Sequence, residues 1–271
     1  GLQAFLLNDW QIAHKVLHKP SLNQPLSGVS LLFSAKAASN HGQLDEARLI
    51  LTQFRDQHPD QADYAKTLLA EWLITSAEID EAKSTLLALT NQSSRSLQLL
   101  SKVYSYQSDW SALYALLPQI KRQSGMDKDS LATLQIDCYC GLLSMPEKDL
   151  PASARANKVQ AVWSEIPRNL RQDSALISVY VRALSAADEG EKALSILSKA
   201  LKNQWQQGLV EAFGGLKLKD ATKQLAQGEN WLVMHPKDAD LLLALGRICR
   251  HMGFLGKAKD YLKSTLSLIH I

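Results

Sequence analysis

A repeated pattern of two helices joined by a turn constrains the fold of this chain more than any other sequence feature. The first clear copy, Ser27–Asp60, consists of an apolar helix, a turn at Asn40–Gly42, a second helix and a closing Pro59. About thirty-five residues further on, AEIDEA at Ala77–Ala82 echoes GQLDEA at Gly42–Ala47. One such pair cannot bury its apolar stripe alone, so the repeat predicts a stack of helix pairs.

Further copies extend the pattern through the chain. A weaker copy has Trp110 at the position of Leu44 and Ile79, another covers Asp173–Asn203, and the last begins at Asp238. Small residues stand where the paired helices should cross: Ala35, Ala47, Ala70, Ala82, Gly246 and Ala258. We therefore predict an all-α, tetratricopeptide-like right-handed solenoid of about six to seven antiparallel helix pairs.

The composition agrees with a helical array. Hydrophobic residues make up 46% of the chain and aromatic residues 7%, with only 13 Gly and 8 Pro in 271 residues. Helix formers dominate, and alternating runs of β-branched and polar residues are almost absent. We expect no sheet.

The proline-rich stretch at 144–156 interrupts the repeat. We predict helical repeats over 1–143, a connecting loop at 144–156 and further helical repeats over 157–271, with one continuous solenoid as an open alternative. Lys217–Lys223 is polar and basic, and we expect a second irregular loop there.

Charge and cysteine content narrow the function classes. The chain carries 30 basic and 27 acidic residues mixed along its length, for a net charge of +3, which does not indicate nucleic-acid binding. Three cysteines favour a reducing compartment over a disulfide framework. No apolar run is long enough to span a bilayer. The chain begins at Gly1 rather than Met, so we expect that a targeting or membrane segment has been removed.

The second half resembles the HemY family of bacterial proteins associated with haem biosynthesis. The resemblance rests on five blocks in order and on the opening segment: WSEIPRNLRQD (Trp163–Asp173), YVRAL (Tyr180–Leu184), NQWQQGLVEAFG (Asn203–Gly214), GENWLVMHPKDADLLLALGRIC (Gly228–Cys249), GKAKDYLKSTL (Gly256–Leu266) and GLQAFLLNDWQIAHKVL (Gly1–Leu17). The resemblance implies a protein of the bacterial inner membrane, with amino-terminal membrane helices outside this chain and a repeat domain linked to late haem synthesis. We expect that domain on the cytoplasmic side.

The first helix of each pair should line the concave face of the array. The residues that follow the crossing positions there are mostly basic: Lys36, Lys102, Arg182 and Arg247, with Arg250 one turn beyond and Glu71 as the acidic exception. Fixed cations in a groove suit carboxylates of a partner protein or the propionates of a porphyrin. The alternative is that these residues belong to solvated helix faces.

Few cysteine and histidine residues are spaced so that they could bind one metal ion or haem together. Cys138 and Cys140 are two residues apart on a predicted helix and point in different directions, so we predict no metal site there. His14 and His18 are four apart and share a helix face. If haem binds, we expect His14, His18 or His251 as the ligand.

Motifs of catalysis are missing from the sequence. We find no nucleophile elbow, phosphate-binding loop or His-Glu-x-x-His motif, and no flavin-binding fingerprint such as the oxidase that shares the HemY name would require. We therefore predict a non-enzymatic scaffold that binds haem-pathway proteins. The alternatives are a direct haem carrier and an assembly factor unrelated to haem.

Overall fold

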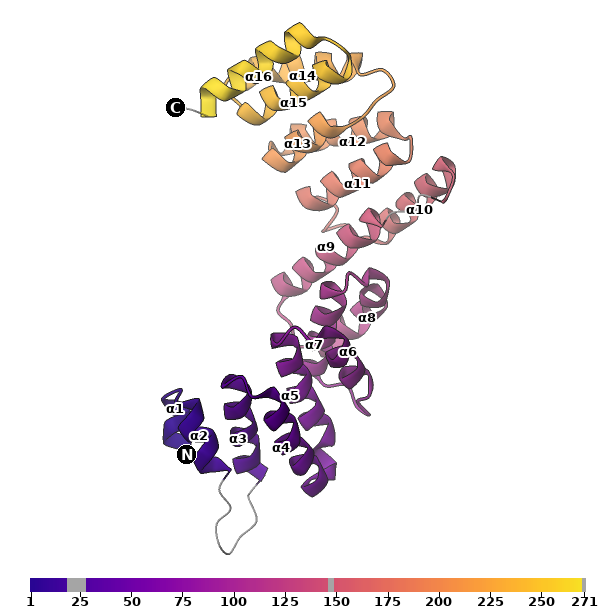
Figure 1. Cartoon of the computed structure of the whole chain (residues 1–271). Coiled ribbons are helices and arrows are strands. Elements are labelled where there is room, and N and C mark those ends of the chain that lie inside the picture. Colours follow the sequence, from indigo (N-terminus) through magenta and orange to yellow (C-terminus); the bar gives the residue numbers. More distant parts are fainter. Residues whose placement is uncertain (19–27, 146–148, 270–271) are drawn as a thin grey trace, which may run out of the picture. The chain divides into compact units, whose positions relative to one another are not determined.

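The computed structural model describes residues 1–18, 28–145 and 149–269, and these residues form helices without any strand (Figure 1). Two compact units divide the chain, Gly1–Asp127 and Lys128–Ile271. The predicted all-α class is confirmed.

The first unit stacks three helix hairpins behind two short helices. Its helices are α1 (Leu2–Leu6), α2 (Trp10–Leu17), α3 (Gly28–Asn40), α4 (Leu44–Gln57), α5 (Ala62–Thr75), α6 (Ile79–Leu87), α7 (Ser94–Tyr106) and α8 (Trp110–Gln123), with a 3-10 turn at Pro59–Gln61. Each helix from α2 onward packs on the next one along the chain. Leu31, Ile50 and Phe54 are completely or almost completely buried in a core that α3, α4 and α5 share.

The second unit repeats this arrangement with four helix pairs. Its helices are α9 (Lys128–Ser144), α10 (Ala152–Glu165), α11 (Ser174–Ala186), α12 (Gly190–Asn203), α13 (Gln207–Gly215), α14 (Thr222–Met234), α15 (Ala239–His251) and α16 (Leu255–Ile269). The first helices of the pairs form one layer, because α9 packs on α11, α11 on α13, and α13 on α15. One continuous hydrophobic core runs from Tyr139 to Ala258.

The crossing positions behave as the repeat predicts. Ala35, Ala47, Ala70 and Ala82 are fully buried, and Ala258 is 4% exposed. A Cβ on Gly246 would lie 3.0 Å from the Leu262 side chain on α16. Small residues therefore let the paired helices approach closely.

The connection in the middle of the chain is shorter than the sequence suggested. We predicted a loop over 144–156, but α9 ends at Ser144 and α10 already begins at Ala152, directly after Pro151. Proline is tolerated at the start of a helix because the first amide groups have no partner within the helix. The two compact units divide at Asp127, ahead of this connection.

Side chains cap several of the helices. Asp9, Ser93, Asp109, Asp173 and Asp238 each stand directly before a helix and accept a hydrogen bond from a backbone N–H of its first turn. Such caps satisfy donors that the helix itself leaves free. They set the starting points of α2, α7, α8, α11 and α15.

Five of the turns inside the hairpins share one backbone feature. The second residue after the first helix adopts a left-handed conformation, with φ of 83° at Gly42, 62° at Ala77, 54° at Ser108, 66° at Asp188 and 78° at Gly253. This conformation costs energy for any residue except glycine. The turn geometry is thus kept where the sequence does not supply glycine.

Candidate partner-binding groove

An open groove crosses the layer of first helices in the second unit. It has a volume of about 470 Å³ and is bounded by α11, α13 and α15. Its lining residues are Ser174, Ala175, Ser178, Arg182, Gly208, Glu211, Ala212, Gly215 and Arg247. This groove is the candidate functional site.

The groove exists because the middle helix presents small residues to it. Gly208, Ala212 and Gly215 recur on one face of α13 and line the floor. A Cβ added to Gly208 or to Gly215 would meet nothing within 4 Å, whereas a Cβ on Gly214 would lie 2.6 Å from Cα of Ala244. Close packing on α15 therefore explains Gly214, and the other two glycines leave space open to the outside.

Two arginines form the basic part of the groove. Arg182 projects from α11 and Arg247 from α15, and both are exposed. The Nε of Arg182 donates to the carbonyl oxygen of Ser178 at 3.1 Å, which holds its stem along its own helix. Guanidinium groups bind carboxylates through charge-assisted hydrogen bonds.

Helix α13 contributes an acidic residue to the groove. Glu211 lines the groove, and Gln207 Nε2 donates to Oε1 of Glu211 at 3.2 Å and to Oδ1 of Asp240 at 3.4 Å. Burial, followed by the nearby charges of Asp238 and Glu211, raises the pKa of Asp240 above its ordinary value. The groove thus has basic walls and an acidic side, which favours a partner that carries both charge signs.

The remaining residues of the predicted cationic ladder lie elsewhere. Lys36 on α3 and Lys102 on α7 are exposed residues of the first unit. Arg250 on α15 is exposed but is not a lining residue of the groove. In the first unit Glu71 pairs with Arg95, with 2.6 Å between Oε1 and Nη2. Of the five predicted cations, the groove brings together Arg182 and Arg247.

The histidines considered for haem already have protein partners. Nδ1 of His14 lies 3.0 Å from Oγ of Ser34, and Nε2 lies 3.0 Å from Oε1 of Glu46. The ring of His18 stacks on that of His14, with centroids 5.6 Å apart. Nε2 of His251 lies 3.4 Å from the carbonyl oxygen of Leu218. To bind haem iron, His14 would first have to give up one of its contacts.

Thiols and metal-binding groups give no further site. Cys138 and Cys249 are buried, Cys140 is half-buried, and none of the three forms a disulfide. Burial is the main cause that raises the pKa of Cys138 to about 12 and that of Cys140 to about 11, so neither is an activated nucleophile. Within the described ranges, three or more His, Cys, Asp or Glu side chains do not come together as a metal site.

Sequence reasoning missed the middle wall of the groove. The repeat pattern is weak over α13, which has only nine residues, and Glu211 therefore did not align with the predicted ladder. The signal that could have found it is QGLVEAFGG, where Gly208 and Gly215 lie two turns apart on one helix face.

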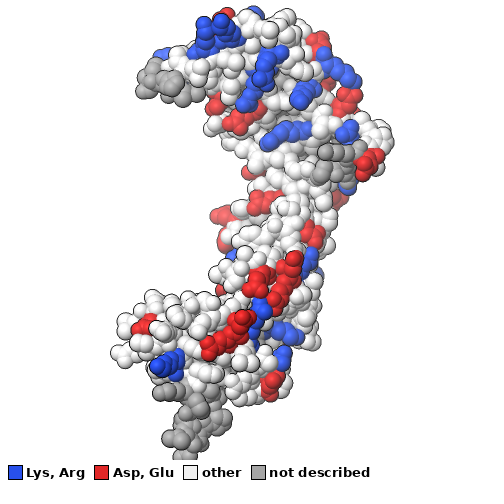
Figure 2. All heavy atoms as spheres, viewed as in Figure 1, with Lys and Arg blue, Asp and Glu red and all other residues white. Residues whose placement is uncertain are grey.

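Figure 2 shows, on one face, basic and acidic side chains interspersed over each unit, in agreement with the mixed charges along the sequence.

Comparison with known proteins gives a distant relationship. The chain is 24% identical over 213 residues to Protein HemY of Escherichia coli strain K12 and to Protein HemY of Shigella flexneri, which covers 74% of this chain and 50% of each relative. The chain thus spans about half the length of the curated relatives it matches. No model of a protein family matches it. The chain is a distant relative of the HemY proteins, as its sequence blocks suggested.

Chains in two solved structures are similar to this chain at low sequence identity. A chain in the structure of Naa15/Naa10 bound to HypK-THB has a TM-score of 0.42 and 14% identity, covering 98% of this chain and 46% of that one. A chain of the APC/C hetero-tetramer Cut9-Hcn1 has a TM-score of 0.34 and 14% identity, covering 98% of this chain and 58% of that one.

Among the described residues, none of the helices has the length and apolarity needed to cross a membrane.

Proposed function

We propose that this chain is the repeat domain of a non-enzymatic scaffold that binds a partner protein through the groove between α11, α13 and α15. The observation that carries the proposal is the pair Arg182 and Arg247 on the walls of a groove whose floor is made of glycine and alanine. Arg250, which is exposed on the same helix α15 as Arg247, would extend the contact with a longer partner.

The groove suits a polypeptide better than a small substrate. It is open to solvent and lined by side chains from three helices, whereas sites for small molecules enclose most of the ligand. A helix or an extended segment can lie on the small residues of α13, with acidic side chains toward Arg182 and Arg247. Its basic side chains would then face Glu211.

The link to haem rests on the distant relationship to the HemY proteins. We propose that the partners are enzymes of late haem biosynthesis and that the whole protein is anchored in the bacterial inner membrane through segments outside this chain. The repeat domain would then face the cytoplasm, where those enzymes can reach the groove. Because the chain matches about half of its relatives' length, these statements concern the whole protein.

Partner capture from membranes tests the groove. The wild-type chain and the Arg182→Glu/Arg247→Glu variant would be crosslinked to membrane extracts, and haem-pathway enzymes quantified by mass spectrometry. The Lys237→Glu/Lys259→Glu variant is the matched control, since it makes the same charge change at exposed positions outside the groove lining. We expect about a tenfold loss of capture for the groove variant and little loss for the control.

Two results would contradict the proposal in different ways. Equal capture by the groove variant and the wild type would remove the groove from the binding surface. Capture of other proteins in place of haem-pathway enzymes would favour an assembly factor unrelated to haem.

Direct haem carriage is the second candidate. The stacked pair of His14 and His18 is the observation that favours it, since both rings lie on one face of α2. A haemin titration would then give a saturable one-to-one Soret shift that His14→Ala/His18→Ala abolishes. A shift that neither saturates nor depends on these residues would exclude them as ligands.

A further inference from the structure

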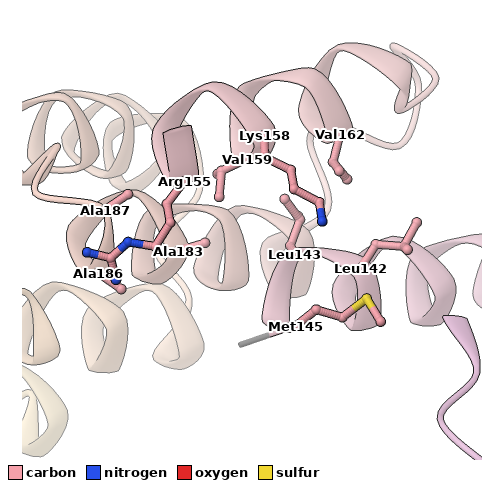
Figure 3. A pocket seen from close by; sticks show the side chains of 10 residues that line it. All are labelled: Leu142, Leu143, Met145, Arg155, Lys158, Val159, Val162, Ala183, Ala186 and Ala187. Carbon is pink, nitrogen blue, oxygen red and sulfur yellow. The ribbon is translucent and has the colours of Figure 1, made fainter. Parts of the chain in front are cut away.

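A second, smaller pocket lies between α9, α10 and α11. Its volume is about 80 Å³, and it is shown in Figure 3. The lining residues are Leu142, Leu143, Met145, Arg155, Lys158, Val159, Val162, Ala183, Ala186 and Ala187. None of them lines the groove of Arg182 and Arg247.

Most of the lining residues are aliphatic, and the size of the pocket is that of a side chain. A cavity of roughly 150 Å³ admits benzene, so this pocket takes a smaller apolar group. Ala183 and Ala186 on α11 leave the space that larger residues would fill, and Leu142 and Met145 approach from α9 and the residue after it (Figure 3). One branched aliphatic side chain matches this space.

The charged residues of the pocket are both basic. Arg155 and Lys158 line it from α10, and no acidic residue is among the lining residues. In Figure 3 the side chain of Arg155 reaches from α10 toward Ala183 and Ala186. Its Nε is buried and has no hydrogen-bond partner. A buried donor without an acceptor is costly, and a carboxylate is the strongest acceptor for a guanidinium.

We propose that this pocket binds the carboxyl-terminal residue of a partner polypeptide that ends in a branched aliphatic amino acid. In such a residue the side chain and the α-carboxylate leave the same Cα. The aliphatic group can therefore fill the space over Ala183 and Ala186 while the carboxylate accepts from Arg155, which is itself a wall of the pocket. An internal acidic residue would place its carboxylate further from the inserted side chain.

Selection from a peptide library with free carboxyl termini tests the proposal and requires no identified partner. The purified chain is the bait, and we expect Leu, Ile or Val to be enriched at the last position. Fluorescence anisotropy then compares a selected peptide with its carboxamide form. The carboxamide should bind about tenfold more weakly, because the charge-assisted bond to Arg155 is lost.

Variants connect the binding to this pocket. Arg155→Gln removes the guanidinium, and Ala186→Leu fills the space from an exposed position; each should weaken binding of the free-acid peptide about tenfold. Arg168→Gln is the matched control, an exposed arginine outside the pocket lining, and should leave binding unchanged. If Ala186→Leu does not fold, as judged by circular dichroism, Arg155→Gln decides.

The proposal is overturned if the selection yields no aliphatic preference at the last position, or if the carboxamide binds as well as the free acid. Equal binding by Arg155→Gln would also overturn it. The proposal does not depend on the groove, because the charge-reversal variant at Arg182 and Arg247 should still bind the peptide.

Discussion

Trp205 donates its indole N–H to Oδ2 of Asp238 over 2.7 Å, while Oδ1 of the same carboxylate caps α15 by accepting from Leu241 N at 2.9 Å. The Trp205 ring also stacks on His235, with centroids 4.0 Å apart. One aspartate therefore fixes both the start of α15 and the segment that leads into α13. These two helices border the groove.

Replacing Asp238 should separate these two roles. Asp238→Ala removes both the cap and the bond to Trp205, and we expect the free energy of unfolding to fall by about 2 kcal/mol. Asp238→Asn keeps an oxygen for the cap but offers the indole N–H an amide N–H₂, so an intermediate loss of about 1 kcal/mol is expected. Urea denaturation measures both. Combined with Trp205→Phe, Asp238→Ala should cost about 1 kcal/mol less than the sum of the two single changes, because the double variant loses the shared hydrogen bond only once.

Neighbouring glycines on α13 should respond differently to alanine. In Gly214→Ala the new Cβ would lie 2.6 Å from the backbone of Ala244, so we expect a loss of about 2 to 3 kcal/mol. In Gly208→Ala the Cβ meets nothing within 4 Å, and helix propensity should stabilise the chain by up to about 1 kcal/mol. Thermal unfolding distinguishes them, and a destabilised Gly208→Ala would contradict the open floor of the groove.

The hairpin turn at Ala77 carries conformational strain that glycine should relieve. Its φ of 62° lies in the left-handed region, which costs about 1 kcal/mol for alanine. Ala77→Gly should therefore raise the free energy of unfolding by about 0.5 to 1 kcal/mol, even though glycine gains entropy in the unfolded chain. Gly42→Ala at the equivalent turn, with φ of 83°, should lower it by a similar amount. Opposite signs in urea denaturation are the expected result.

The ion pair between α14 and α16 should make stability depend on acid pH. The pKa of Glu229 is lowered below its ordinary value of 4.5 by hydrogen bonds from Lys257 and Tyr261. The bond from Lys257 has the larger effect. Glu229 therefore adds stability above pH 4.5, which is lost as the pH falls through its lower folded pKa.

Comparison of Glu229→Gln with the wild type at two pH values measures this contribution. The variant should be less stable than the wild type at about pH 7, and the difference should shrink at about pH 3, where the wild-type carboxylate is protonated to a larger extent. The effect should be modest because the pair is largely exposed. A difference that does not change with pH would show that the charge of Glu229 is not its cause.

Local sequence patterns are enough to specify the helix pairs. Such patterns are the apolar periodicity, the similarity between Gly42–Ala47 and Ala77–Ala82, and the small residues at the helix crossings. The packing contacts that they specify lie within one repeat or between adjacent repeats. The ordered sequence blocks from Trp163 onward likewise indicate the distant relationship to the HemY proteins.

Which side chains share a site depends on how the helices pack. Arg182 and Arg247 line one groove because α13 lies between their helices and carries no side chain at Gly208 and Gly215. The repeat pattern is weak over α13. The pocket beside Arg155 likewise depends on three helices meeting where alanines of α11 leave space. A groove is the volume that packed helices do not fill, and that volume depends on contacts between helices far apart in sequence, which no local pattern specifies.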